Sequence, residues 1–126
     1  MIVINFAHPL TEAQLAQIRQ LSGQEVSQVI DVKTQFDPSA PFVEQMKVVL
    51  QGIPLDSKEW QTCGFLISLP SLNAIAAIIL AELHGLMGYF PTIIRIRPIM
   101  ESLSPAYEVA ELINLQALRD AARLNR

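Results

Sequence analysis

The polar residues with the clearest chemical potential follow a short apolar run at residues 64–68. Ser71 is placed to cap the long helix that comes next. The first turn of a helix presents unpaired backbone N–H groups and the positive end of the helix dipole. With the hydroxyls of Ser68 and Ser71 and the amide of Asn73 beside it, this turn predicts a cradle for a phosphate or nucleotide. The alternative is that Ser71 is an ordinary N-cap and Asn73 a surface residue.

A second polar segment follows the first apolar run, residues 2–6. His8 comes directly after that run and could hydrogen-bond a phosphate or a base, or act as a general acid or base. It could equally be a surface residue of a turn. Thr11, followed three residues later by Gln14, is typical of a capping box and predicts that a helix begins here.

Two arginines stand on one face of the apolar run at residues 92–97. Arg95 and Arg97 could neutralise phosphates. They could also pair with glutamates, and four candidates occur in the second half of the chain: Glu82, Glu101, Glu108 and Glu111.

Several familiar constellations are absent from the sequence. No Gly-x-Gly-x-x-Gly follows the first apolar run and no Gly-Lys-Ser/Thr occurs, so a dinucleotide cofactor or a P-loop is not expected. The two histidines and the single cysteine, Cys63, lack the spacing of metal ligands, and we expect no metal and no cofactor. No nucleophile elbow and no carboxylate pair stand out, so the residues themselves give an enzyme little support.

Composition narrows the class of protein. The chain has 126 residues, of which 51% are hydrophobic and 17% charged, as expected for one globular domain spanning residues 1–126. A formal net charge of −3 argues against a general DNA or RNA binder. The longest apolar run, residues 74–81, is far too short to span a membrane, and the N-terminus lacks the features of a signal peptide. We therefore expect a cytoplasmic protein.

The pattern of apolar residues predicts an α/β fold. Short β-rich runs occupy residues 2–6, 25–32, 64–68, 92–97 and 107–112, and helical patterns separate or follow them in the order β-α-β-α-β-α-β-β-α. This order predicts a small Rossmann-like fold, a mostly parallel sheet with helices on both faces. In such sheets ligands bind beyond the carboxyl ends of the strands, and three segments qualify here: residues 7–11, 68–73 and 97–99.

The helix predicted from Ser71 to about Gly85 has an unusual composition. Its middle, residues 74–81, is apolar almost all round. Such a helix is buried on more than one side. In so small a domain we expect its second side to meet another subunit.

Seven segments carry a family resemblance: residues 5–11, 59–61, 69–73, 81–85, 88–91, 95–98 and 114–119. Together they resemble the Csx-fifteen group of CRISPR-associated ancillary proteins, and the resemblance covers most of the chain. That family belongs to type III CRISPR systems, in which cyclic oligoadenylates act as alarm signals. The resemblance implies a CARF-like (CRISPR-associated Rossmann) fold and a homodimer that binds cyclic tetra-adenylate across its two-fold axis.

On this basis the first hypothesis is a binder that sequesters the messenger. The contacts expected for phosphate or ribose are Ser68, Ser71 and Asn73, and the adenine pocket would be lined by His8, Pro9 and Leu10, with Arg97 neutralising charge. A second hypothesis is a metal-independent ring nuclease that cleaves the same ligand by in-line attack of a ribose 2′-hydroxyl. A third is a structural protein whose apolar helix builds an oligomer and which has no nucleotide ligand.

Overall fold

Five strands form one sheet in the order β2-β1-β3-β4-β5, in a computed structural model that describes all residues, 1–126. The first four strands run parallel and the fifth runs antiparallel to its neighbour. This arrangement confirms the predicted small Rossmann-like fold. The strand bounds are β1 (Ile2–Asn5), β2 (Gln28–Asp31), β3 (Phe65–Ser68), β4 (Thr92–Pro98) and β5 (Tyr107–Asn114).

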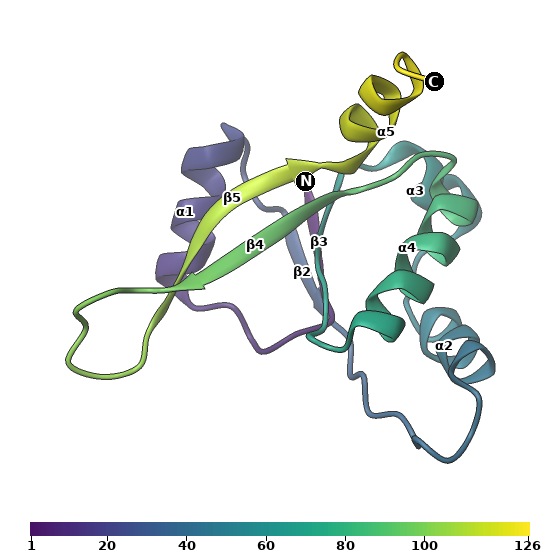
Figure 1. Cartoon of the computed structure of the whole chain (residues 1–126), viewed down its shortest axis with the longest axis horizontal. Helices are drawn as coiled ribbons and strands as arrows, with labels where there is room; N and C mark the ends of the chain where they lie inside the picture. Colours follow the sequence, from purple (N-terminus) through teal and green to yellow (C-terminus); the bar gives the residue numbers. More distant parts are fainter.

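Helices cover both faces of the sheet, as predicted. One face is covered by a single helix, α1, and the other by α2, α3 and α4, while a last helix stands at the end of β5 (Figure 1). No helix is long and apolar enough to cross a membrane. The helix bounds are α1 (Glu12–Ser22), α2 (Phe42–Gln51), α3 (Ser57–Thr62), α4 (Asn73–Met87) and α5 (Leu115–Arg123).

The two faces of the sheet have separate hydrophobic cores, because successive strand residues point to opposite sides. Ile4 and Ile67 are fully buried in the larger core against α2, α3 and α4. Val3 and Leu66 are buried in the smaller core, where Ile18 of α1 packs against them. The alternation means that the next residue of each central strand, Asn5 and Ser68, points to the α1 side.

Several helix ends lie where local sequence predicts them. Thr11 caps α1, its hydroxyl accepts a hydrogen bond from the Gln14 amide, and the Gln14 side chain completes the capping box. Asn114 caps α5 by accepting from Ala117 N–H. Of the two glycines, Gly85 and Gly88, that the sequence offers to end α4, the second does so, and the helix runs to Met87. Gly88, with a φ of +85°, supplies the left-handed conformation that ends it.

In the single chain α4 is buried on one side only. Its buried stripe consists of Ile75, Ile79, Leu83 and Met87, which repeat every four residues. On the opposite side the small side chains of Ala77 and Ala81 are exposed. The second covered side that the composition predicts therefore has no cover within this chain.

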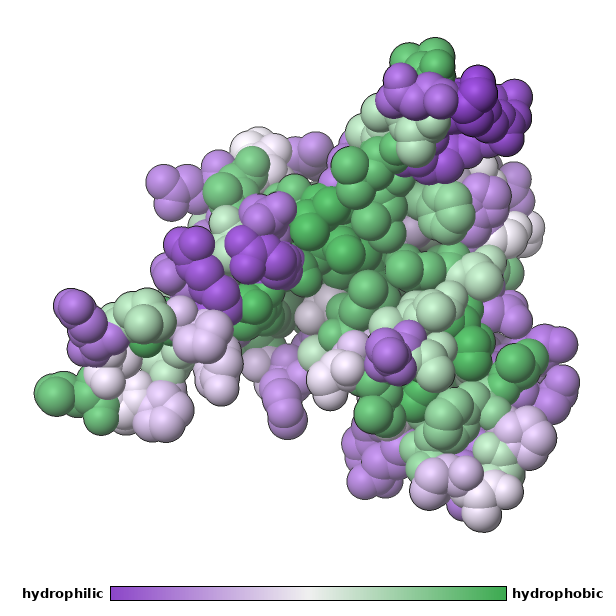
Figure 2. All heavy atoms as spheres, in the orientation of Figure 1, coloured by the Kyte–Doolittle hydropathy of each residue, from purple (hydrophilic) through white to green (hydrophobic).

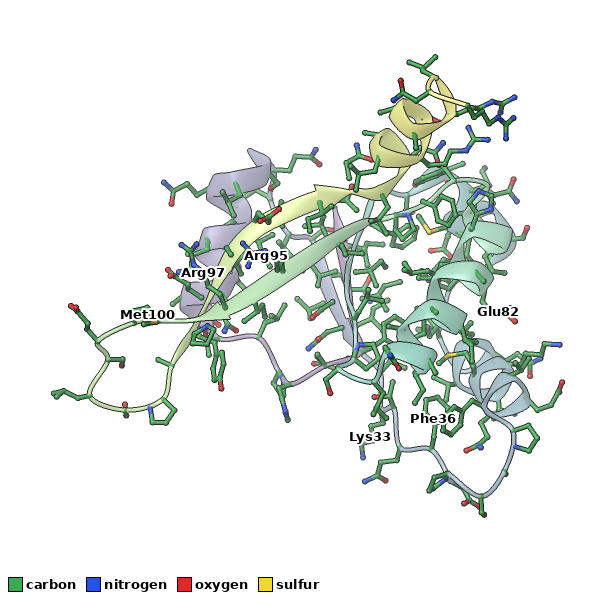
Figure 3. All side chains as sticks on the ribbon, viewed as in Figure 1. Lys33, Phe36, Glu82, Arg95, Arg97 and Met100 are labelled. Atoms are coloured by element: carbon green, nitrogen blue, oxygen red, sulfur yellow. The ribbon has the colours of Figure 1, made fainter.

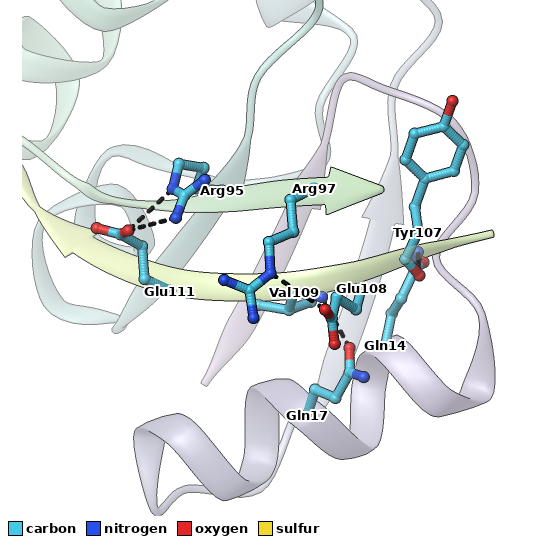
Figure 4. Close-up of polar contacts among 8 residues, drawn as sticks. All are labelled: Gln14, Gln17, Arg95, Arg97, Tyr107, Glu108, Val109 and Glu111. Atoms are coloured by element: carbon cyan, nitrogen blue, oxygen red, sulfur yellow. Dashed lines mark hydrogen bonds and ion pairs between the residues drawn. The ribbon is translucent and has the colours of Figure 1, made fainter. Parts of the chain in front are cut away.

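The β4–β5 hairpin extends beyond the rest of the sheet and carries ion pairs across its two strands. Arg95 pairs with Glu111, with 2.7 Å between Nη2 and Oε2. On the other side of the hairpin, α1 covers the outer edge of β5: the Gln14 side chain donates to Tyr107 O and the Gln17 side chain accepts from Val109 N (Figure 4). An edge strand whose outward backbone groups are satisfied is a poor template for further strands.

Candidate functional site

A crevice lies where β1 and β3 end, at the carboxyl edge of the parallel strands. The sheet order reverses here, because the chain goes from β1 to β2 on one side and reaches β3 on the other. Ligands of open α/β sheets bind at such a switch point. Of the three predicted segments, residues 7–11 and 68–73 lie together at this point, since Asn5 pairs with Ser68 in the strand register.

Asn5 organises the floor of the crevice. Asn5 is completely buried, and both the nitrogen and the oxygen of its side-chain amide form hydrogen bonds. The Nδ2 atom donates to His8 O at 2.8 Å and to the Asp31 carboxylate at 3.0 Å, and Oδ1 accepts from Ala7 N–H at 3.0 Å. These three bonds tie the turn after β1 to the end of β2.

Ser68, next to Asn5 in the sheet, is different. Only 3% of this residue is exposed, yet its hydroxyl has no hydrogen-bond partner within the chain. No fully buried polar side-chain atom in the chain lacks a partner, so Oγ must be within reach of solvent from the crevice. A nearly buried hydroxyl with free bonding capacity at a switch point is suited to receive a ligand.

The prediction that Ser71 caps α4 is wrong. The N-cap residue is Leu72, and no side chain bonds to the first-turn amides. The first N–H that the helix satisfies is that of Ala76, which donates to Leu72 O. The N–H groups of Asn73 and its two successors are therefore free, as are the exposed side chains of Ser71 and Asn73. An uncapped helix start has more donors available to an anion than a capped one.

The turn after β1 holds three of the predicted contact residues. His8 and Pro9 are exposed, and Leu10 is half-buried, where it packs against the core on the α1 side. The exposed His8 ring is attached to a backbone that the Asn5 amide holds in place. Leu10 is thus mainly a structural residue, whereas His8 is available to a ligand.

Arg97 forms an ion pair within the chain. Its Nε atom lies 3.1 Å from Glu108 Oε1, and both side chains remain partly exposed. This confirms the alternative that the two arginines pair with glutamates. Exposed pairs of this kind contribute about 0–1 kcal/mol, so the guanidinium can exchange its partner at small cost.

Two walls of the crevice were not predicted from the sequence. Figure 3 shows Met100, in the loop of the β4–β5 hairpin, on one side of the crevice, and Lys33 and Phe36, in the segment after β2, on the other. Figure 2 shows a hollow between these two projections of the surface. In the second wall, hydrogen bonds from the hydroxyl and N–H of Ser39 lower the pKa of Asp37 and fix its turn.

The site offers hydrogen-bond donors rather than reactive groups. Two surface hollows of about 300 and 330 Å³ lie in the hairpin loop and between β2 and α2, so neither encloses the Ser68 side of the crevice. No cluster of three or more histidine, cysteine, aspartate or glutamate side chains is arranged to hold a metal ion. The arrangement can bind an anionic, hydroxyl-bearing ligand through Ser68, Ser71, Asn73 and the free amides of α4.

Comparisons with known proteins add no relatives. No protein-family profile matches the sequence, and neither the curated proteins nor the solved structures contain a significant match.

The different bonding of Asn5 and Ser68 leads to a prediction about stability. Asn5→Ala removes three hydrogen bonds from a buried position and should lower the free energy of unfolding by about 1–3 kcal/mol. Ser68→Ala, its neighbour on the same face, removes no bond and should change it by less than about 0.5 kcal/mol. Urea denaturation of the two variants measures both values. Equal losses would contradict the assignment of Ser68 as a free hydroxyl.

Proposed function

We propose that this protein binds a cyclic oligoadenylate, cyclic tetra-adenylate in particular, across the two-fold axis of a homodimer. By sequestering this second messenger it would tune type III CRISPR antiviral signalling. The observation that carries the proposal is the uncapped start of α4 at the carboxyl edge of the sheet, where β3 also ends with the free hydroxyl of Ser68. The identity of the ligand comes from the resemblance to the Csx-fifteen group.

The chemistry of the crevice supports a phosphodiester ligand. The first turn of a fifteen-residue helix provides amide donors and the positive end of its dipole. Ser71 and Asn73 have free side chains at this turn, and Ser68 ends β3 on the α1 side of the sheet, so phosphate and ribose oxygens would find donors at the carboxyl edge from both faces. His8 and Pro9, in the turn after β1, would contact the adenine.

The shape of the crevice supports a shared site. It is open to solvent in one chain (Figure 2), and the hollows in the hairpin loop and between β2 and α2 do not include the donors. A cyclic tetranucleotide has two-fold symmetry, and two copies related by a two-fold axis would present the same donors to both halves of the ring. Each chain would then supply half of the enclosure.

The first test is binding of labelled cyclic tetra-adenylate. Ser71→Ala and Asn73→Ala should each weaken binding about tenfold, because each removes a hydrogen bond to a charged or ribose oxygen. Ser22→Ala, at the far end of α1, is the matched control and should bind as the wild type does. Unchanged affinity in the two crevice variants would refute the cradle, and no binding of the wild type at micromolar protein would refute the proposal.

A matched pair of variants tests the part assigned to Arg97. Glu108→Gln releases Arg97, and Glu111→Gln releases Arg95, with the same change in net charge. If Arg97 neutralises the ligand, Glu108→Gln should bind cyclic tetra-adenylate several-fold more tightly than Glu111→Gln in a titration at fixed salt. Equal affinities of the two variants would mean that Arg97, like Arg95, only pairs with a glutamate of the hairpin and does not contact the ligand.

The second candidate function is a ring nuclease, favoured by the exposed His8 ring on a rigidly held turn. Conversion of cyclic tetra-adenylate to linear di-adenylate would establish cleavage, and intact ligand after long incubation would establish sequestration. If the protein cleaves the ring through His8, His8→Ala should retain binding and lose cleavage. Cleavage at an unchanged rate in this variant would exclude His8 as the acid or base.

A further inference from the structure

The C-terminal helix α5 is the element that its own chain covers least. None of its residues is buried, and it reaches the body of the protein mainly through β4. Its two anchors are the hydrogen bond from Phe90 N to Gln116 Oε1, at 2.9 Å, and the longer one from Leu115 N to Pro91 O. A helix of nine residues is marginal in water unless an apolar face is packed. The chain itself thus leaves the apolar side of α5 without cover.

The unpacked side of α5 is apolar. Leu115, Leu118 and Ala122 follow one another at intervals of three and four residues, which places them on one side of the helix. Leu118 is 58% exposed. In Figure 2 a hydrophobic area extends from α5 over β4 and β5 towards α4. Contiguous exposed areas of this kind mark interaction surfaces.

This hydrophobic area combines three elements. On the sheet, Ile93 and Ile113 pair across β4 and β5 on the side of α4 and are only partly buried. On α4 the stripe with Ala77 and Ala81 is exposed as well. A surface built from two helices and a sheet face is suited to a folded partner. Binding to a lipid surface needs only a single amphipathic helix.

The charges indicate which folded partner fits. Residues 115–126 contain three arginines and one aspartate, a formal charge of +2, so residues 1–114 carry −5 of the total of −3. The aspartate pairs with Arg119, whereas Arg123 and Arg126 have no ion pair within the chain. A second copy of this chain offers both an acidic body and the same hydrophobic area, and complementary charge favours such an encounter.

We propose that α5 and the adjoining hydrophobic area of β4, β5 and α4 bind a second copy of this chain about a two-fold axis. Such an axis buries the same area on both copies. Because α4 runs from the crevice towards the α5 end, copies whose α4 helices lie parallel have both crevices at one end of the dimer. The proposed function already requires a homodimer, so the existence of the dimer rests on that function. The choice of surface rests on the uncovered apolar side of α5.

Leu118→Glu tests the surface, and Leu103→Glu is the matched control, because Leu103 is a fully exposed leucine in the hairpin loop. Both substitutions should leave the circular dichroism spectrum unchanged. In sedimentation velocity from low to high micromolar protein, the wild type and Leu103→Glu should be dimers. Leu118→Glu should dissociate at more than about tenfold higher concentration, because an unpaired carboxylate would be buried in the contact. Arg123→Glu should also weaken the dimer, through lost charge complementarity.

Three results would overturn the inference: a monomeric wild type at high micromolar concentration, a Leu118→Glu dimer as tight as the wild type, or equal dissociation by Leu103→Glu. A monomer that sediments with phosphatidylserine vesicles in a Leu118-dependent way would make this a membrane surface instead. The proposed function fails separately. A wild-type dimer that does not bind cyclic tetra-adenylate would refute the proposed ligand but not the proposed dimer surface. A wild-type monomer that binds cyclic tetra-adenylate would refute the dimer surface but not the ligand.

Discussion

The carboxyl edge of the sheet depends on one buried amide, that of Asn5. Its two donors and one acceptor are all used, and they join the turn after β1 to the end of β2. A buried amide is costly unless it is bonded in this way, so the turn has little freedom to rearrange. Because the Asn5 amide bonds to the turn, the backbone at His8 is held in place where the chain leads into α1. The hydroxyl of the neighbouring Ser68, in contrast, forms no hydrogen bond within the chain.

The free donors of the crevice arise because α4 lacks a side-chain N-cap. The helix that begins at the crevice has Leu72 at its N-cap, which cannot bond to the first-turn amides. A side-chain cap would contribute about 1 kcal/mol to stability, and α4 does without it. The helix is held instead by its long buried stripe against the sheet. Packing along the length of α4 thus allows the amides of its first turn to stay unsatisfied, and an anionic ligand would gain most there.

Local sequence rules predicted much of this architecture because they act over a few residues. The capping box of Thr11 and Gln14 depends only on neighbours, and it is present as predicted. The alternation of apolar residues and the order of elements were sufficient for a mostly parallel sheet. They also placed residues 7–11 and 68–73 at one edge, since parallel strands end together.

The remaining features depend on contacts between distant residues. Asn5 is a single polar residue in an apolar run, and its partner Asp31 lies 26 positions away, so its role required the sheet register. Ser71 has the right residue type for a cap, but the weak preference for a cap does not fix where the turn between β3 and α4 ends. The choice between phosphate and glutamate as the partner of Arg97 likewise required the pairing of β4 with β5.

The central claim is that two crevices share one cyclic ligand, and the stoichiometry of binding tests it most directly. Titration of the wild-type protein with cyclic tetra-adenylate in a calorimeter, with the ligand recovered and checked for integrity, gives the number of rings bound per chain. We expect one intact ring for every two chains. Saturation at one ring per chain, or the absence of heat at micromolar protein together with no retention of labelled ligand, would contradict it.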